Sequence, residues 1–125
     1  MTTIHANSPR DALSRLENMV GLTGLSIGLK PLRQQIASAI SVVIQIARLA
    51  DGKRKLISLQ EITGMEGDVI EMQEIFRFRQ AGVAASGAVQ GSFQATGIRP
   101  RFCDRLAARG APLPEHLFFE HESLC

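Results

Sequence analysis

Residues 41–79 read SVVIQIARLADGKRKLISLQEITGMEGDVIEMQEIFRFR, and this stretch decides the fold that we expect for the 125-residue chain. Its β-branched beginning indicates a strand buried on both faces. The Asp51-Gly52 pair that follows is typical of a tight hairpin turn, because both residues tolerate the positive φ angles that such a turn needs. A return strand over 53–63 and, after a glycine-rich turn, a strand over 69–79 complete a predicted three-stranded antiparallel meander.

Helices are expected before and after this meander. The stretch 8–21 reads SPRDALSRLENMVG, in which Ser8 caps a helix that a glycine ends. Prolines open two further helices over 31–40 and 100–110, since a proline in the first helical turn needs no amide partner. Apolar residues recur at helical spacing in these segments, so each helix has one side suited to packing on the sheet.

The segment that follows the meander carries few large side chains. Residues 81–91 consist mostly of alanine, glycine and other small residues, which favours a surface loop with little fixed structure. One more short strand is expected over 92–95, and residues 120–125 are interpreted as a tail.

The composition is that of an ordinary globular domain. Hydrophobic residues make up 45% of the chain and charged residues 21%, and the formal net charge is +2. The richest apolar segment, residues 37–50, is interrupted by Gln45 and Arg48, so we expect no membrane-spanning helix and, from the first ten residues, no secretory signal. Cys103 and Cys125 are too few for a disulfide framework or a four-ligand zinc site and are interpreted as free thiols.

A phosphate-binding loop of the form G-x-x-x-x-G-K-[ST] is absent from the sequence. The Gly52-Lys53 pair fails the pattern at both ends, because Ala47 stands where the first glycine belongs and Arg54 where a hydroxyl should bind the metal. No apolar strand ends in the paired acidic residue that positions Mg²⁺. We therefore expect this chain alone not to turn over nucleotide.

His5 is the most suggestive single residue. It lies beside the hydroxyl groups of Thr2 and Thr3 and just ahead of a helix amino terminus, where an imidazole could face an anion. Taken alone, a histidine near a terminus is more often a solvated side chain. Other candidate acid-base, metal or phosphate ligands are interpreted more simply as turn formers or solvated helix residues: Glu66, Asp68, Arg10, Arg15 and Arg33.

Several stretches in order resemble one family. MTTIHANSPRDALSRLENMV is similar to the histidine box and following helix of the ATPases of type II and type IV secretion systems, most closely the CpaF/TadA branch that drives Flp (tight-adherence) pilus assembly. The stretch IASAISVVIQIARLADGKRKLISLQEITGMEGDVIEMQEIFRF resembles that branch's helix, hairpin and turn, and GSFQATGIRPRFCDRL resembles its carboxy-terminal end.

The resemblance implies an α/β fold, with residues 1–119 forming the C-terminal portion of a RecA-like P-loop NTPase domain, helices packed on a sheet with an antiparallel meander. It implies a hexamer that uses ATP and Mg²⁺, in which Thr3, His5 and Asn7 approach the terminal phosphate and His5 acts as sensor or transition-state contact. It also implies a cytoplasmic protein held at the inner membrane by pilus or secretion platform proteins, without nucleic acid.

The Walker motifs of that family lie upstream of the matching region, so we expect the chain to be a fragment of such an ATPase. A fragment would expose the apolar stripe of Leu13, Leu16 and Val20 and would be poorly soluble or molten. An alternative is a short non-catalytic subunit or docking module of the same machinery. A small basic nucleic-acid binder is the weakest reading, since the chain lacks a concentrated basic stripe and has no Trp or Tyr.

Overall fold

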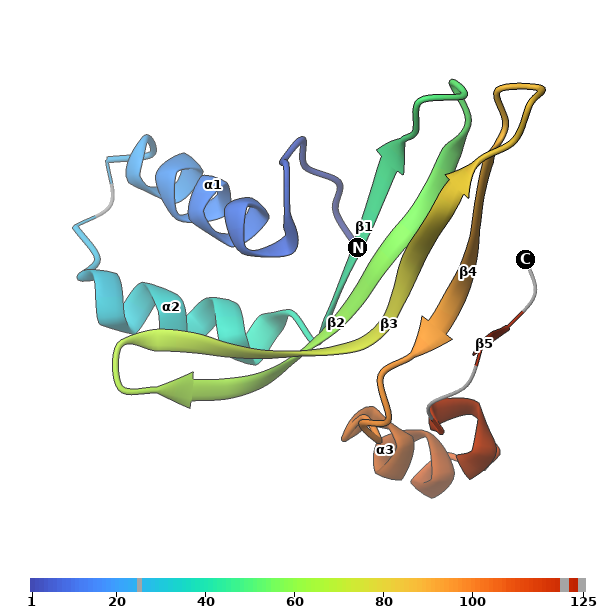
Figure 1. Cartoon of the computed structure of the whole chain (residues 1–125). Helices are drawn as coiled ribbons and strands as arrows, with labels where there is room; N and C mark the ends of the chain where they lie inside the picture. The colour runs from blue at the N-terminus through green and yellow to red at the C-terminus, as the bar shows by residue number, and fades with distance from the viewer. Residues whose placement is uncertain (25, 120–121, 124–125) are drawn as a thin grey trace.

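The computed structural model describes residues 1–24, 26–119 and 122–123. Two helices precede the sheet (Figure 1), and one helix and one 3-10 turn follow its main strands. In chain order the elements are α1 (Pro9–Gly21), α2 (Leu29–Ala39), β1 (Val42–Arg48), β2 (Arg54–Glu66), β3 (Val69–Val83), β4 (Val89–Ala95), α3 (Phe102–Ala108), η1 (Glu115–Phe118) and β5 (Glu122–Ser123).

The sheet is antiparallel throughout the described residues. Its strands lie in the order β1-β2-β3-β4-β5, so each strand pairs with its sequence neighbour. The predicted three-stranded meander is therefore confirmed and extended. The expectation that its first strand is buried on both faces is wrong, because β1 is the outermost strand and Ile44 and Ile46 are exposed. The expected RecA-like P-loop fold is wrong, because that fold requires parallel strands. Parallel neighbours need crossovers of a dozen or more residues, whereas short turns join β1 to β2, β2 to β3 and β3 to β4.

The segment 81–91 is a hairpin and not the expected loop. β3 continues to Val83 and β4 begins at Val89, and Ala84 N donates to Ala88 O at 2.8 Å to close the turn. A register shift lies between Gln80 and Gly82. The small side chains misled the sequence interpretation, because strand pairing is made by backbone groups and does not require large residues.

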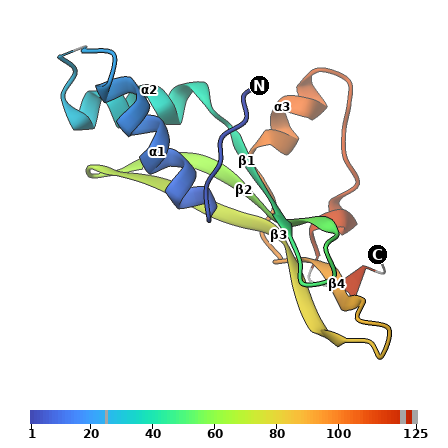
Figure 2. The same ribbon diagram turned by 90° about the horizontal axis from the view of Figure 1, so that it is seen from above.

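The helices α1 and α2 cover the end of the long β2–β3 hairpin (Figure 2). Their buried apolar residues form one core with residues of that hairpin: Leu13, Leu32, Ile36, Ile62 and Ile70. Leu16 and Val20 pack against this cluster. The expectation that Leu13, Leu16 and Val20 form an exposed stripe is thus wrong, because the tip of the chain's own hairpin supplies the surface that covers them.

A second core lies where α3 and η1 meet the sheet. Ile75, Cys103 and Phe118 are buried together, and Phe76 stacks on Phe93 with ring centroids 5.4 Å apart. Burial in this core raises the pKa of the Cys103 thiol. The sheet thus carries two separate cores, one under α1 and α2 and the other under α3 and η1.

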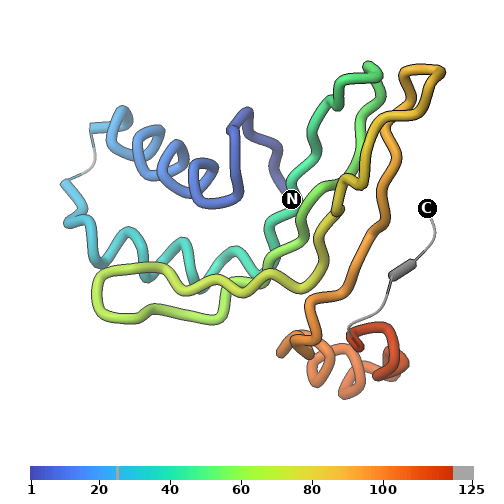
Figure 3. The backbone as a smooth tube through the Cα atoms, in the orientation of Figure 1, coloured from blue at the N-terminus to red at the C-terminus, as the bar shows by residue number. Residues whose placement is uncertain are grey.

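Asp51 connects two turns at the same end of the sheet, which Figure 3 shows side by side. One carboxylate oxygen accepts from Val89 N and the other from Lys53 N, each at 3.0 Å. These two bonds, the one from Val89 first, lower the pKa of Asp51 below its ordinary value of 3.8. The carboxylate therefore ties the β1–β2 turn to the beginning of β4.

Acid is expected to release this connection. Because the folded pKa of Asp51 is lower than the unfolded one, its contribution is complete above pH 3.8 and is lost as the pH falls through the lowered folded pKa. The Val89 amide proton should move in NMR spectra with a midpoint below pH 3.8. The same proton in Asp51→Asn should not titrate, and a midpoint at or above 3.8 in the native chain would contradict the assignment.

Candidate functional site

The three residues of the histidine box lie in an extended segment ahead of α1. Thr3, His5 and Asn7 are all exposed. Asn7 N donates to Asp11 Oδ2 at 3.0 Å, and Ala6 O accepts from Gln45 Nε2 of β1 at 3.1 Å. These contacts hold the Ala6–Asn7 end of the segment beside β1 and α1. The Thr3 and His5 side chains have no hydrogen bond or ion pair among the described contacts.

The start of α1 follows directly from the sequence after this segment. Ser8 has an extended backbone, and its Oγ accepts from Asp11 N at 3.0 Å, as its place before Pro9 predicted. This cap sets where the segment ends and the helix begins. An accessible imidazole and a hydroxyl in such a segment can donate hydrogen bonds to an anion brought by another molecule.

Arg10 and Arg33 have structural partners. Arg10 Nη2 donates to Ile70 O at 2.9 Å, and Arg33 Nη1 donates to Asp68 O at 2.8 Å. Arg33 also pairs with Glu17, with 2.8 Å between Nε and Oε1. A cavity of about 160 Å³ lies among these side chains. The two arginines therefore hold the β2–β3 turn against α1 and α2.

The remaining charged candidates also behave as structural residues. Arg15 lies 3.5 Å from Asp11 on the same helix, and Asp68 of the β2–β3 turn lies 3.7 Å from Lys30 of α2. Glu66 is exposed at the end of β2. Within the described residues no three His, Cys, Asp or Glu side chains are grouped as a metal site would require.

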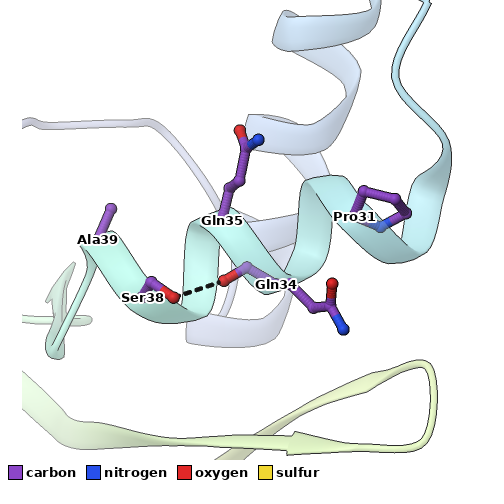
Figure 4. Close-up of a pocket in the computed structure, with 5 residues that line it drawn as sticks. All are labelled: Pro31, Gln34, Gln35, Ser38 and Ala39. Carbon is purple, nitrogen blue, oxygen red and sulfur yellow. Dashed lines mark hydrogen bonds between the residues drawn. The ribbon is translucent and has the colours of Figure 1, made fainter.

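A surface hollow of about 430 Å³ lies on the outer face of α2 (Figure 4). Five residues of that one helix line it: Pro31, Gln34, Gln35, Ser38 and Ala39. Ser38 Oγ donates to Gln34 O at 3.0 Å, so its hydroxyl is bonded to its own helix. The hollow contains no titratable group and offers no acid-base chemistry.

A larger groove of about 630 Å³ runs between the beginning of β1 and α3. Apolar side chains and two arginines line most of it: Val42, Leu59, Phe102, Leu106, Arg105 and Arg109. Sequence reasoning missed this groove, because its walls are about 60 residues apart in the chain. The available signal was the spacing of Arg105 and Arg109, which places both on one side of a helix.

Comparison with known proteins gives a partial similarity. The chain is 34% identical over 67 residues to proteins named "Putative conjugal transfer protein" from two strains of Mycobacterium tuberculosis, CDC 1551 / Oshkosh and H37Rv. The match covers 54% of this chain and 18% of each relative, so it spans less than a fifth of their length. No protein-family model matches the chain. Among the described residues, no helix combines the length and apolar character needed to cross a bilayer.

Proposed function

We propose that the chain works in a type IV secretion or Flp pilus machinery, as the carboxy-terminal portion of its hexameric ATPase. The observation that carries the proposal is the 67-residue similarity to the conjugal transfer proteins. The CpaF/TadA-like motifs from the histidine box to the region of α3 support the more specific assignment. ATP and Mg²⁺ are held elsewhere in the assembly, since this chain has no phosphate-binding loop.

In this proposal Thr3, His5 and Asn7 form the part of the chain that meets the nucleotide. Their exposure supports the role, because a group that contacts ATP held by another part of the motor has to be accessible. His5 donates a hydrogen bond to the terminal phosphate and loses that partner on hydrolysis. The change then passes to α1, which begins at Pro9, immediately after the segment.

The position of the machinery follows from the same proposal. A secretion or pilus motor of this kind is held at the inner membrane by platform proteins, without a membrane-spanning segment of its own.

The first test is to sequence the DNA upstream of the Met1 codon and to search the reading frame for a G-x-x-x-x-G-K-[ST] loop. An in-frame phosphate-binding loop would support the assignment to the ATPase. An in-frame stop codon would leave only the alternative of a non-catalytic docking subunit.

Replacing His5 tests the catalytic part of the proposal. His5→Ala should reduce ATP hydrolysis by the assembled motor by about a hundredfold, since it removes a donor to the transferred phosphate. The thermal midpoint of the chain should stay unchanged, because the His5 side chain is exposed. His116→Ala, which removes another exposed histidine, is the matched control. Equal hydrolysis by the two variants would remove His5 from the mechanism.

A further inference from the structure

We propose that the outer edge of β1 binds an extended segment of a partner protein, with apolar side chains along the strand and acidic side chains at its end. The surface consists of β1 and of the groove between β1 and α3, which we call the edge groove. It involves residues other than Thr3, His5 and Asn7. The proposal therefore holds whether or not the chain acts in an ATPase.

The backbone of β1 has one unpaired side in the part of the chain that the structure describes. β1 is the outermost strand and pairs with β2 alone. Ser41 O accepts from β2 at 2.9 Å, and Leu49 N donates to Lys53 O at 2.9 Å. Because hydrogen-bonding directions alternate along an antiparallel strand, the even-numbered residues between them point their N–H and C=O groups outward. These residues are Val42, Ile44, Ile46 and Arg48.

The side chains of this edge are apolar and accessible. Ile44 is 52% exposed and Ile46 is 59% exposed. Native edge strands are usually protected by charged residues, prolines or a covering element, because an open apolar edge pairs readily with another strand. Two exposed isoleucines on one unpaired edge are therefore suited to strand addition, in which backbone bonds supply affinity and side-chain pockets supply specificity.

The edge groove adds a positive end to this apolar surface. Val42 of β1 lines it together with Phe102 and Leu106, and Arg105 of α3 and Arg109, the residue after α3, complete it. Both arginines are exposed, and neither forms an ion pair with a carboxylate of the described residues. Acidic side chains at the end of an added strand would meet these two guanidinium groups.

A second copy of the chain fits this surface poorly. Two β1 edges related by a two-fold axis pair antiparallel, which brings the Arg48 end of one copy to the Ser41 end of the other. Arg48 lies directly opposite Arg54 on β2. Pairing would set these two arginines near Arg105 and Arg109 of the partner copy, and like charges so placed oppose association. Charge therefore favours an acidic partner.

Two labelled peptides test the proposal by fluorescence anisotropy. Both alternate valine with threonine over eight residues, and one ends in three glutamates and the other in three lysines. The acidic peptide should bind at least about tenfold more tightly than the basic one. The double variant Arg105→Glu/Arg109→Glu should lose that preference. Arg77→Glu/Arg79→Glu, which makes the same charge change at two exposed sites on β3, should keep it.

The role of the strand edge is tested separately from the role of charge. Ile44→Pro removes one outward N–H and should weaken binding of the acidic peptide, whereas Ile44→Thr keeps that N–H and should retain most of the binding. Circular dichroism reports whether either variant remains folded. Equal binding of both peptides, no binding of either, or unchanged binding by the arginine double variant would overturn the proposal. So would a dimer in sedimentation that Ile44→Pro abolishes, because it would assign the edge to a second copy.

Discussion

Glu61→Ala is expected to lower the free energy of unfolding by about 3 kcal/mol. The Glu61 side chain is 1% exposed, and its two oxygens accept from Arg101 N and Phe102 N, each at 2.8 Å. These are charge-assisted bonds, and they hold the beginning of α3 on β2. Alanine would leave both N–H groups without this acceptor in a partly buried position, which costs more than the loss of an exposed bond.

Urea unfolding followed by far-UV circular dichroism measures this effect, since the chain has no Trp or Tyr for fluorescence. Glu61→Gln keeps one accepting oxygen and should lose about half as much stability. Glu66→Ala removes an exposed glutamate from the same strand and should change stability by less than about 0.5 kcal/mol. If Glu61→Ala and Glu66→Ala unfold at the same urea concentration, the carboxylate does not hold α3.

Gly91→Ala is expected to destabilise the chain by about 2 kcal/mol. Gly91 lies opposite Gln80 in the β3–β4 pair. A Cβ built at Gly91 would collide with the Arg79 carbonyl oxygen and the tip of the Phe78 ring, and it would lie 3.0 Å from Gln80 Cα. Two of these obstacles are backbone atoms, so a side-chain rotation cannot relieve the collision. The strands have to separate or the register has to shift.

Gly82→Ala is the matched control for this variant. Gly82 lies in the same hairpin, yet a Cβ built there meets no atom within 4 Å, and its φ is not positive. The change should therefore leave stability within about 0.5 kcal/mol of the native chain, since alanine also reduces the freedom of the unfolded state. Equal stabilities for Gly91→Ala and Gly82→Ala would mean that β3 and β4 are less closely paired than the structure shows.

The local elements were largely predictable. The first helix begins after Ser8 and ends at Gly21 as the sequence indicated, and the Ser8 cap acts within a few residues. Asp51-Gly52 lies in the first turn as expected, but the tight turn with two positive φ angles is wrong, because only Gly52 has a positive φ (+79°) and a longer turn over 49–53 joins the strands. The prediction failed for 81–91, where the side chains are small and the hairpin is held by backbone bonds between β3 and β4.

The candidate site residues were predictable from the sequence only where a local motif contains them. The positions of Thr3, His5 and Asn7 followed from a sequence motif, and their proposed role stays a prediction. The roles of Arg10 and Arg33 did not follow, because their acceptors lie 60 and 35 residues away in the chain. The edge groove was also hidden, since residues near Ser41 and Arg105 meet only after the sheet has folded.

The sequence by itself determined the start of α1, the positions of the first two turns and the antiparallel meander, because caps, turn residues and hydrophobic periodicity are local properties. The tertiary structure alone decided that the tip of the β2–β3 hairpin covers the apolar side of α1, and that Glu61 holds α3. It also decided that β1 is left with an open edge. Each of these depends on which surfaces meet across long separations, and a short-range pattern contains no information about that.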